Sequence, residues 1–212
     1  MRNPSLVLVG FSGNAIEIFE AAERERTVVA ILDDNPVHAG KDFEGVPIRP
    51  LSALPDYEHA DVVCLVGSQH SYRRRKEIIR RLGLPPSRFA TIVHPHALVS
   101  RFASIGRGVV LYQGVTVTAN AVIGDHVIVL PNTVIHHDVV VGDHCVIGTH
   151  VTIAGHCHIG DSVYVGSASS IRDGTTVGAE ALIGMAANVV RDVEPGTVVA
   201  GNPARPRPRR EG

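Results

Sequence analysis

Seven of the twelve histidines in this chain of 212 residues lie between residues 126 and 158. An imidazole changes its charge close to neutral pH, so it can move protons, and its neutral form is a common metal ligand. The stretch could therefore bind a metal ion or supply a general base. These histidines are His126, His136, His137, His144, His150, His156 and His158.

The histidines lie within a six-residue repeat that runs from Ala97 to Asp192 without insertion. The third residue of every hexapeptide is a branched aliphatic residue. Repeats of this kind build a parallel β-helix, because no coil can bury its own face and each must stack on neighbours ~4.8 Å away. The aliphatic positions are Val99, Ile105, Leu111, Val117, Ile123, Val129, Ile135, Val141, Ile147, Ile153, Ile159, Val165, Ile171, Val177, Ile183 and Val189.

Glycines follow a longer period of eighteen residues, which predicts coils of three short faces and about five coils in all. This period is seen in Gly106, Gly124, Gly142, Gly160 and Gly178. It places His137 beneath Gly155, and Asp138 beneath His156. None of the histidines occupies an aliphatic position, so we expect their side chains to point outward or to lie at corners.

Two kinds of chemistry fit such a set of histidines. In the first, a metal is held as in the hexapeptide β-helix proteins that resemble γ-class carbonic anhydrases, by two histidines five residues apart and a third. No two histidines here have that spacing, and ligands need geometry as well as type, so we expect no metal.

In the second, acyl transfer, one histidine takes a proton from an attacking amine or hydroxyl, while a backbone N–H stabilises the oxyanion formed from a thioester. His137 at a corner, with Asp138 adjacent and Gly155 above, offers that arrangement. For His137 taken alone, an exposed or capping histidine is the better explanation, and its stacked neighbours are what favour a general base.

The first 94 residues have a different pattern, of apolar runs that alternate with helical segments. Strand, glycine turn, helix and strand is the order of a small doubly wound sheet, and we place the join of two domains near His94-Pro95, giving domains 1–94 and 95–212. The predicted strands cover Ser5 to Val9, Thr27 to Leu32 and Ala60 to Val66, and the helices Ala15 to Arg24 and Tyr72 to Leu82.

The carboxyl ends of these strands are rich in glycine and acidic residues. Ligands bind at this edge of such sheets, where a helix N-terminus offers free N–H groups to an anion. The turn after the first strand lacks the full G-x-G-x-x-G fingerprint, and glycines that only make tight turns are an alternative explanation. The residues placed at this edge are Gly10, Ser12, Gly13, Asp33, Asp34 and Gly67.

Composition argues against several classes of protein. A formal charge of −1 offers no field for a polyanion, so we expect no nucleic-acid partner. No segment has the length of a membrane span, and Leu6 to Val9 is too short for the core of a signal peptide. Three cysteines without a CxxC motif fit a reducing compartment, so we expect a cytoplasmic protein.

Other features have simpler explanations. We expect all three cysteines to be core residues, and the arginines of Arg73-Arg74-Arg75 and Arg80-Arg81 to be solvated. We expect the arginine-rich tail, with Arg205, Arg207, Arg209 and Arg210, to be a disordered end. Contact of these arginines with the phosphates of a ligand is the alternative.

Several segments, in this order, resemble the bacterial sugar acetyltransferases that include UDP-4-amino-sugar N-acetyltransferases and sialic acid O-acetyltransferases. The resemblance covers nearly the whole chain. Its parts are the opening Val9 to Ala15, the strand end Ile31 to Asn35, the segment Val134 to Asp138 followed by Val141-Gly142-Asp143, the unbroken hexapeptides, and the ending Ala200 to Ala204.

The resemblance implies a left-handed, triangular β-helix behind a small Rossmann-like domain, so that the fold class is α/β followed by β. It also implies a homotrimer with acetyl-CoA between neighbouring β-helices and a nucleotide sugar on the N-terminal domain. The matching residues make His137 the general base, Asp138 its orienting neighbour and Gly155 the oxyanion donor.

The edge residues Gly10, Ser12, Gly13, Asp33 and Asp34 match the family's nucleotide-binding loops, and we add Asn14 and Gly67 to the predicted substrate site. Many relatives have histidine at the positions of Asn14 and Val146. The resemblance therefore does not specify which sugar this protein acetylates.

The expected activity is transfer of acetyl from acetyl-CoA to the amino group of a nucleotide-linked sugar, in bacterial surface glycan biosynthesis, without a metal. O-acetylation of a sugar and a non-catalytic nucleotide-sugar scaffold are the alternatives.

Overall fold

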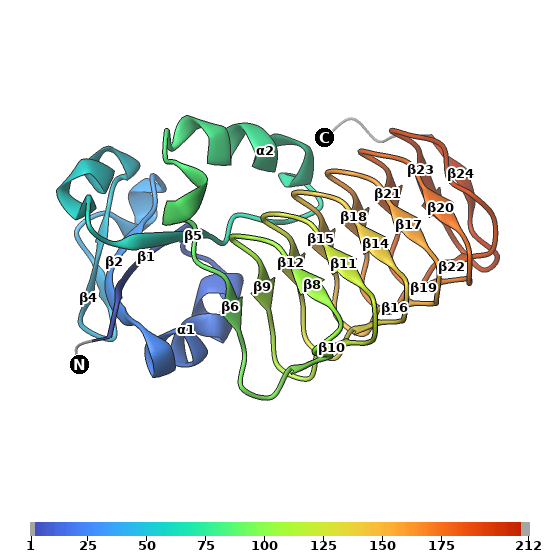
Figure 1. The fold of residues 1–212 in the computed structure, drawn as a ribbon. Coiled ribbons are helices and arrows are strands. Elements are labelled where there is room, and N and C mark those ends of the chain that lie inside the picture. The colour runs from blue at the N-terminus through green and yellow to red at the C-terminus, as the bar shows by residue number, and fades with distance from the viewer. Residues whose placement is uncertain (1–2, 209–212) are drawn as a thin grey trace.

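A five-stranded mixed sheet forms the N-terminal part of the protein in the computed structural model, which describes residues 3–208 (Figure 1). The strand order is β3-β4-β2-β1-β5. The pairs β4-β2, β2-β1 and β1-β5 are parallel and β3-β4 is antiparallel. The bounds are β1 Ser5–Val9, β2 Thr27–Leu32, β3 Asp42–Phe43, β4 Val46–Arg49 and β5 Asp61–Cys64.

Helices cover both faces of this sheet, as expected for a doubly wound domain. Leu8 of β1 packs in one apolar cluster with Ile18 of α1, whereas its neighbour Val9 packs in another with Ile79 of α2. This alternation follows from the period of two along a strand. The helices are α1 Gly13–Glu25 and α2 Tyr72–Arg81, with the 3-10 turns η1 Pro36–His38, η2 Leu51–Tyr57 and η3 Pro86–Arg88.

The hairpin β3-β4 was not predicted. It turns on Glu44 and Gly45, whose φ angles of 50° and 76° suit a tight two-residue hairpin. With two residues in β3, its apolar pattern was too short to show in the sequence. The hairpin adds an antiparallel edge to a sheet that was expected to be parallel.

Three parallel sheets form the β-helix, and each strand pairs with the strand eighteen residues away, as in Thr116 with Val134. The eighteen-residue coil is therefore confirmed. One sheet contains β7 Leu98–Val99, β10 Thr116–Val117, β13 Val134–Ile135, β16 Thr152–Ile153, β19 Ser170–Ile171 and β22 Asn188–Val189. The second contains β8 Ser104–Ile105, β11 Val122–Ile123, β14 Val140–Val141, β17 His158–Ile159 and β20 Thr176–Val177.

The third sheet faces the N-terminal domain. It contains β6 Ile92–Val93, β9 Val110–Leu111, β12 Ile128–Val129, β15 Val146–Ile147, β18 Tyr164–Val165, β21 Leu182–Ile183, β23 Val198–Ala200 and β24 Arg205–Arg207. Its first strand, β6, pairs with β9 and precedes His94-Pro95. Arg205–Arg207 forms the antiparallel strand β24 on β23, so the expectation of disorder is wrong there, because backbone pairing orders these residues. Arg209 and Arg210 lie outside the described residues.

The aliphatic positions of the repeat fill the inside of the β-helix. From Leu111 onward they are buried, and only the first two, Val99 and Ile105 at the open end, are half-buried. Cys145 and Cys157 are buried in the same interior, and Cys64 is buried in β5, as predicted. Burial raises the pKa of Cys145 to about 12, which leaves its thiol unreactive.

Helix α2 lies along the β-helix and joins the two parts of the chain (Figure 1). The guanidinium of Arg73 donates to the carbonyls of Glu180 and Gly196. Arg75 is fully buried and donates to the carbonyls of Cys64, Val66 and His126. The expectation of a solvated Arg75 is therefore wrong, because this side chain crosses the contact between the domains.

No helix among residues 3–208 is long and apolar enough to span a bilayer.

Candidate active site

The corner between β13 and β14 presents His137 and Asp138 side by side. Nδ1 of His137 lies 2.8 Å from Oδ2 of Asp138, and the Asn120 side-chain amide donates to Oδ1 at 3.0 Å. The hydrogen bonds from His137 and Asn120 hold the pKa of Asp138 below its ordinary value. An ionised carboxylate on Nδ1 favours the tautomer with a proton there, which leaves the lone pair on Nε2.

Gly155, one coil further on, lies directly against this imidazole. Cε1 and Nε2 of His137 are 2.7 Å and 2.9 Å from the point where a Cβ of residue 155 would stand. The N–H of the next residue, His156, donates to the carbonyl of His137 at 3.1 Å. Within residues 3–208, the Gly155 N–H donates no hydrogen bond. The base, its carboxylate and a free backbone donor are thus brought together.

A second imidazole shares the Asp138 carboxylate, a feature that the sequence argument missed. Nδ1 of His156 is 3.9 Å from Oδ2 of Asp138, and its ring is 5.0 Å from that of His137. The eighteen-residue spacing had already placed Asp138 beneath His156, which was the available signal. Donor atoms of His137, Asp138 and His156 lie within 4.8 Å of one another, so within residues 3–208 these side chains form a group that could hold a metal ion.

Backbone conformation explains much of the crowding of histidines. His126, His144, His150 and His156 occupy corner positions with φ between 56° and 61°. This left-handed region is open to Gly, Asn, Asp and His far more than to other residues. A structural demand of the corner therefore selects four of the seven histidines, whereas His136, His137 and His158 lie outside it.

The predicted substrate residues meet at the carboxyl edge of the N-terminal sheet. Gly10 has a φ of +95°, and a Cβ there would stand 2.7 Å from the Val66 side chain. The Asn14 side chain donates to the carbonyls of Leu65 and Gly67, at 3.3 Å and 3.1 Å. Gly10, Asn14 and Gly67 are therefore neighbours across β1 and β5.

Ser12 and Gly13 form the N-terminus of α1. Ser12 precedes the helix in extended conformation and its hydroxyl makes no capping bond. A Cβ on Gly13 would meet nothing within 4 Å, so there is free space beside the first residue of the helix. An open helix N-terminus favours an anionic group such as a phosphate.

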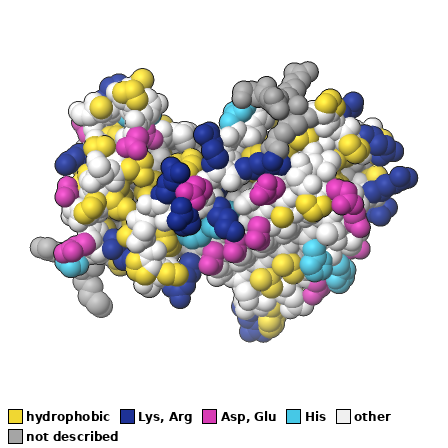
Figure 2. Space-filling model, turned by 90° about the horizontal axis from the view of Figure 1, so that it is seen from above, with side chains coloured by type: hydrophobic (Ala, Val, Ile, Leu, Met, Phe, Trp, Pro, Cys, Tyr) yellow, Lys and Arg dark blue, Asp and Glu magenta, His cyan; other side chains and the backbone are white. Residues whose placement is uncertain are grey.

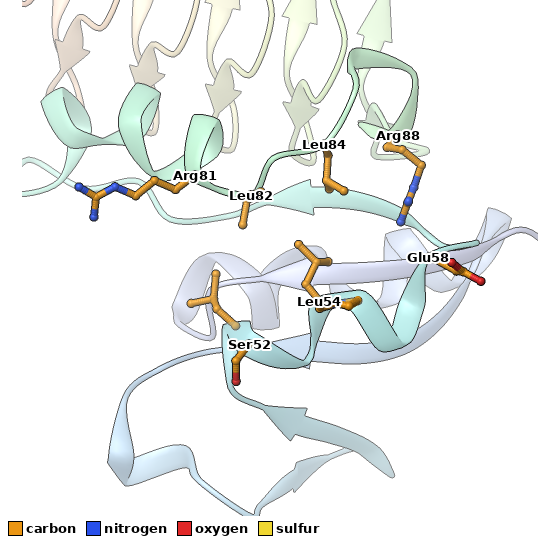
Figure 3. Close-up of a pocket in the computed structure, with 9 residues that line it drawn as sticks. Ser52, Leu54, Glu58, Arg81, Leu82, Leu84 and Arg88 are labelled. Carbon is orange, nitrogen blue, oxygen red and sulfur yellow. The ribbon is translucent and has the colours of Figure 1, made fainter.

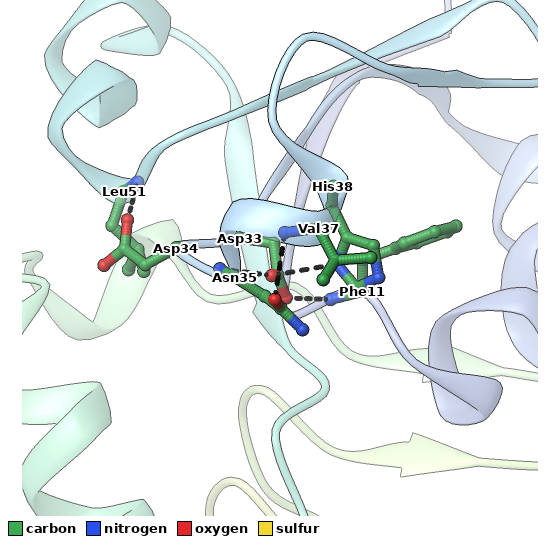
Figure 4. Close-up of polar contacts among 7 residues, drawn as sticks. All are labelled: Phe11, Asp33, Asp34, Asn35, Val37, His38 and Leu51. Carbon is green, nitrogen blue, oxygen red and sulfur yellow. Dashed lines mark hydrogen bonds and ion pairs between the residues drawn. The ribbon is translucent and has the colours of Figure 1, made fainter.

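The acidic residues at the end of β2 are held by the loops around them (Figure 4). Asp33 accepts the N–H groups of Phe11 and Asn35, at 2.7 Å and 2.8 Å, and lies 3.1 Å from Nδ1 of His38. Burial alone raises the pKa of Asp33, but these hydrogen bonds outweigh burial and leave it below its ordinary value. Asp33 therefore fixes the shape of the predicted nucleotide loop.

Asp34 stands beside this loop and accepts the N–H of Leu51 at 2.8 Å, at the start of η2 (Figure 4). One of its carboxylate oxygens is used in this bond, and its second oxygen remains for a ligand.

Val146 is 1% exposed. Its side chain lies 3.1 Å from the point where a Cβ of Gly67 would stand. An apolar residue suits this contact between the two domains, because a buried imidazole there would need hydrogen-bond partners.

A surface groove lies apart from the His137 corner, and Leu51, whose N–H donates to Asp34, is one of the residues that line it. It measures about 350 Å³ and is formed by η2 and the segment that follows α2, including Leu54, Leu82 and Leu84 (Figure 3). Arg88 at its rim already donates to the carbonyls of Tyr57 and Ala60. None of the predicted site residues lines it.

The face seen in Figure 2 mixes basic and acidic side chains without a continuous basic surface, while histidines gather on the side of the β-helix. Within residues 3–208, no hydrogen bond or ion pair joins the His137 corner to the edge with Gly10, Asp33 and Gly67. The candidate site therefore consists of two separate sets of residues on one chain, the His137 corner and the carboxyl edge of the N-terminal sheet.

Comparison with known proteins gives these two groups a context. Residues 120–155 match the family model described as bacterial transferase hexapeptide (six repeats). Over 113 residues the chain is 32% identical to UDP-N-acetylbacillosamine N-acetyltransferase from Bacillus subtilis. The match covers 52% of this chain and 51% of that relative, so it spans about half the length of the curated protein.

Solved structures match over almost the whole chain. The acetyltransferase domain of PglB from Neisseria gonorrhoeae, in complex with acetyl coenzyme A, has 28% identity and a TM-score of 0.87, and the match covers 97% of this chain and 100% of that one. A variant of perosamine N-acetyltransferase from Caulobacter crescentus, in complex with CoA and GDP-perosamine, has 26% identity and a TM-score of 0.87, with 97% of each chain covered. The chain is therefore similar, in its hexapeptide repeat and in its whole fold, to hexapeptide-repeat nucleotide-sugar N-acetyltransferases.

Proposed function

We propose that this protein transfers an acetyl group from acetyl-CoA to the amino group of a nucleotide-linked sugar. The observation that carries the proposal is the contact of the His137 imidazole with Gly155, with Nε2 facing the glycine and Nδ1 on Asp138. A base beside a free N–H is the minimum that acyl transfer from a thioester requires.

The reaction proceeds in a ternary complex. Nε2 of His137 takes a proton from the sugar amine as the nitrogen attacks the acetyl carbonyl carbon. The Gly155 N–H donates to the oxyanion that forms. The carbon–sulfur bond then breaks, and the thiolate of coenzyme A takes the proton from the imidazolium and leaves as the thiol. Asp138 keeps the imidazole oriented and stabilises its charged form.

The donor and the acceptor follow from the solved relatives. The PglB domain binds acetyl-CoA, and the perosamine enzyme binds CoA together with GDP-perosamine. The nucleotide of the acceptor would lie at the edge formed by Gly10, Ser12 and Gly13, with its phosphates at the N-terminus of α1. Asp33 and Asp34 would shape the loop around the nucleobase of the acceptor.

The assembly that we propose is a homotrimer with acetyl-CoA between neighbouring β-helices. His137 is 49% exposed in the single chain, whereas a base that acts on a thioester works best where water is excluded. Val122 and Val140, paired neighbours on β11 and β14, leave apolar surface that a partner could cover. Light scattering after size-exclusion chromatography tests the trimer.

Thiol release from acetyl-CoA, measured with a panel of UDP- and GDP-linked sugars, tests the activity. We expect release with 4-amino sugars, and mass spectrometry should find the acetyl group as an amide. Release with hydroxy sugars and formation of an ester would assign O-acetylation instead. Absence of release with every sugar, together with tight binding of one of them, would assign a scaffold. Metal analysis of the purified, active protein tests whether His137, Asp138 and His156 hold an ion.

A further inference from the structure

Two imidazoles direct the same ring atom at one carboxylate oxygen of Asp138. Nδ1 of His137 lies 2.8 Å from Oδ2 of Asp138, and Nδ1 of His156 lies 3.9 Å from it. The three side chains come from two consecutive coils, which are joined by the hydrogen bond from the His156 N–H to the His137 carbonyl at 3.1 Å. A cation between the two rings would therefore meet two nitrogens and one oxygen on a fixed backbone.

The spacing of these donor atoms is close to what zinc requires. A tetrahedral zinc ion with bonds of ~2.0–2.2 Å to nitrogen and oxygen places its ligand atoms ~3.4 Å apart. The two measured separations, 2.8 Å and 3.9 Å, lie on either side of this value. All three side chains are partly exposed, so small rotations can close the remaining differences and water can supply the fourth ligand.

The carboxylate is also held from its other side, as the ligands of metal sites usually are. The Asn120 side chain donates to Oδ1 of Asp138 at 3.0 Å, which leaves Oδ2 for the two imidazoles. Hydrogen bonds of this kind orient a ligating carboxylate and contribute roughly 10–100-fold to metal affinity. Among residues 3–208, no other group of three His, Cys, Asp or Glu side chains brings its donor atoms this close together.

We propose that His137, Asp138 and His156 bind Zn²⁺, and that the bound ion inhibits acetyl transfer. The inhibition rests on the function proposed above, whereas the metal site does not. A neutral imidazole has one lone pair and one N–H. When zinc takes the lone pair of Nδ1, the ring proton lies on Nε2, which can then no longer accept a proton from the acceptor amine. The neutral ring keeps its proton in this change, and removal of the ion restores the base.

Calorimetry on chelator-treated protein, freed of the chelator, measures zinc binding directly. The tightest binding of Zn²⁺ to the wild type should be one ion per chain. Mg²⁺ should not compete, because hard cations prefer sites built from oxygen ligands. His156→Asn removes one ligand and keeps a residue suited to the left-handed corner, and it should weaken zinc binding at least ~10-fold. His150→Asn is the matched control, since His150 is exposed and has the same φ of 56°, and it should bind zinc as the wild type does.

Inhibition is measured from the acetylated sugar by mass spectrometry, because zinc also binds the thiol of released CoA. The acceptor is the amino sugar with the fastest turnover in the UDP and GDP panel. Each rate is expressed relative to that of the same protein without zinc. With free Zn²⁺ buffered at the wild-type Kd, the wild type and His150→Asn should keep about half of their rate, and His156→Asn about nine-tenths, as the occupancies require. Chelation of the zinc should restore the full rate.

Equal zinc affinity in the wild type and in His156→Asn would overturn the metal site. An unchanged rate of acetyl transfer by the zinc-loaded wild type would overturn the inhibition. If the zinc-free wild type acetylates no sugar of the panel, the proposed function fails and the inhibition fails with it, whereas the calorimetric comparison still decides whether these three side chains bind zinc.

Discussion

The imidazole of His137 lies against the Cα of Gly155, one coil away on the same corner of the β-helix, with Nε2 2.9 Å from the position of a Cβ. A side chain at residue 155 would therefore have to displace this imidazole. Ala119 occupies the same corner two coils before Gly155 and has a methyl group. The residue that stacks on Ala119 is His137 itself. The corner thus tolerates a Cβ where no imidazole lies beneath it.

Gly155→Ala should reduce turnover at least ~10-fold, because the new methyl group would move the imidazole away from the amide that receives the oxyanion. The backbone of Gly155 is not in the left-handed region, and the ring that must move is half exposed. We therefore expect the unfolding midpoint to stay close to wild type. Steady-state kinetics and thermal unfolding check this, and wild-type turnover would show that the contact has no part in catalysis.

His137→Ala should lower kcat at least ~10²-fold, as expected for the loss of a general base. The protein should still fold, because the side chain is exposed and contributes little to the core. His158→Ala, which removes an exposed imidazole from β17, is the matched control and should retain activity. Thiol release with saturating acetyl-CoA measures the effect. If the kcat of His137→Ala is within a few-fold of the wild-type value, this residue has no part in the mechanism.

The β-helix could be predicted from the sequence because its cause is local and periodic. One branched aliphatic side chain in every six residues must point inward, and the register of Thr116 with Val134 then follows from the eighteen-residue period. The same arithmetic predicted the contact of His137 with Gly155. The two strands Ser5–Val9 and Thr27–Leu32 were predicted to the residue because turns bound both apolar runs.

Other features could not be predicted, because they depend on contacts between distant segments. Arg75 belongs to a run of arginines that looks solvated, and only the packing of α2 on the β-helix buries it.

Arg75→Met should lower the free energy of unfolding by at least ~2 kcal/mol, because the carbonyls of Cys64, Val66 and His126 would each lose a buried donor. Methionine retains much of the apolar stem, so lost hydrogen bonding dominates over lost packing. Arg74→Met, at an exposed position of the same helix, should change stability by less than ~0.5 kcal/mol. Urea unfolding measures both, and equal stabilities of the two variants would contradict the assigned role.

The stacked imidazoles of His126 and His144 lie where the two domains meet. Their ring centroids are 5.2 Å apart with planes 4° from parallel, and Nδ1 of each is buried without a partner among the described residues. Burial is the main cause that lowers the pKa of His126 to about 4, and the charges of His144 and Arg75 lower it further against the opposing effect of Asp125 and Asp143. Burial likewise lowers the pKa of His144.

Stability should therefore decrease in acid in a defined range of pH. His126 has its ordinary pKa of 6.5 in the unfolded chain and about 4 in the folded protein, so the unfolded chain binds a proton first as the pH falls. Above pH 6.5 this difference in proton binding does not affect the free energy of unfolding. As the pH falls toward 4, it lowers the free energy of unfolding by about 3 kcal/mol. His126→Asn keeps a residue suited to the left-handed corner and removes this titration. Urea unfolding of the variant at several pH values should give a flatter pH dependence than wild type, and identical slopes would show that other groups cause the acid sensitivity.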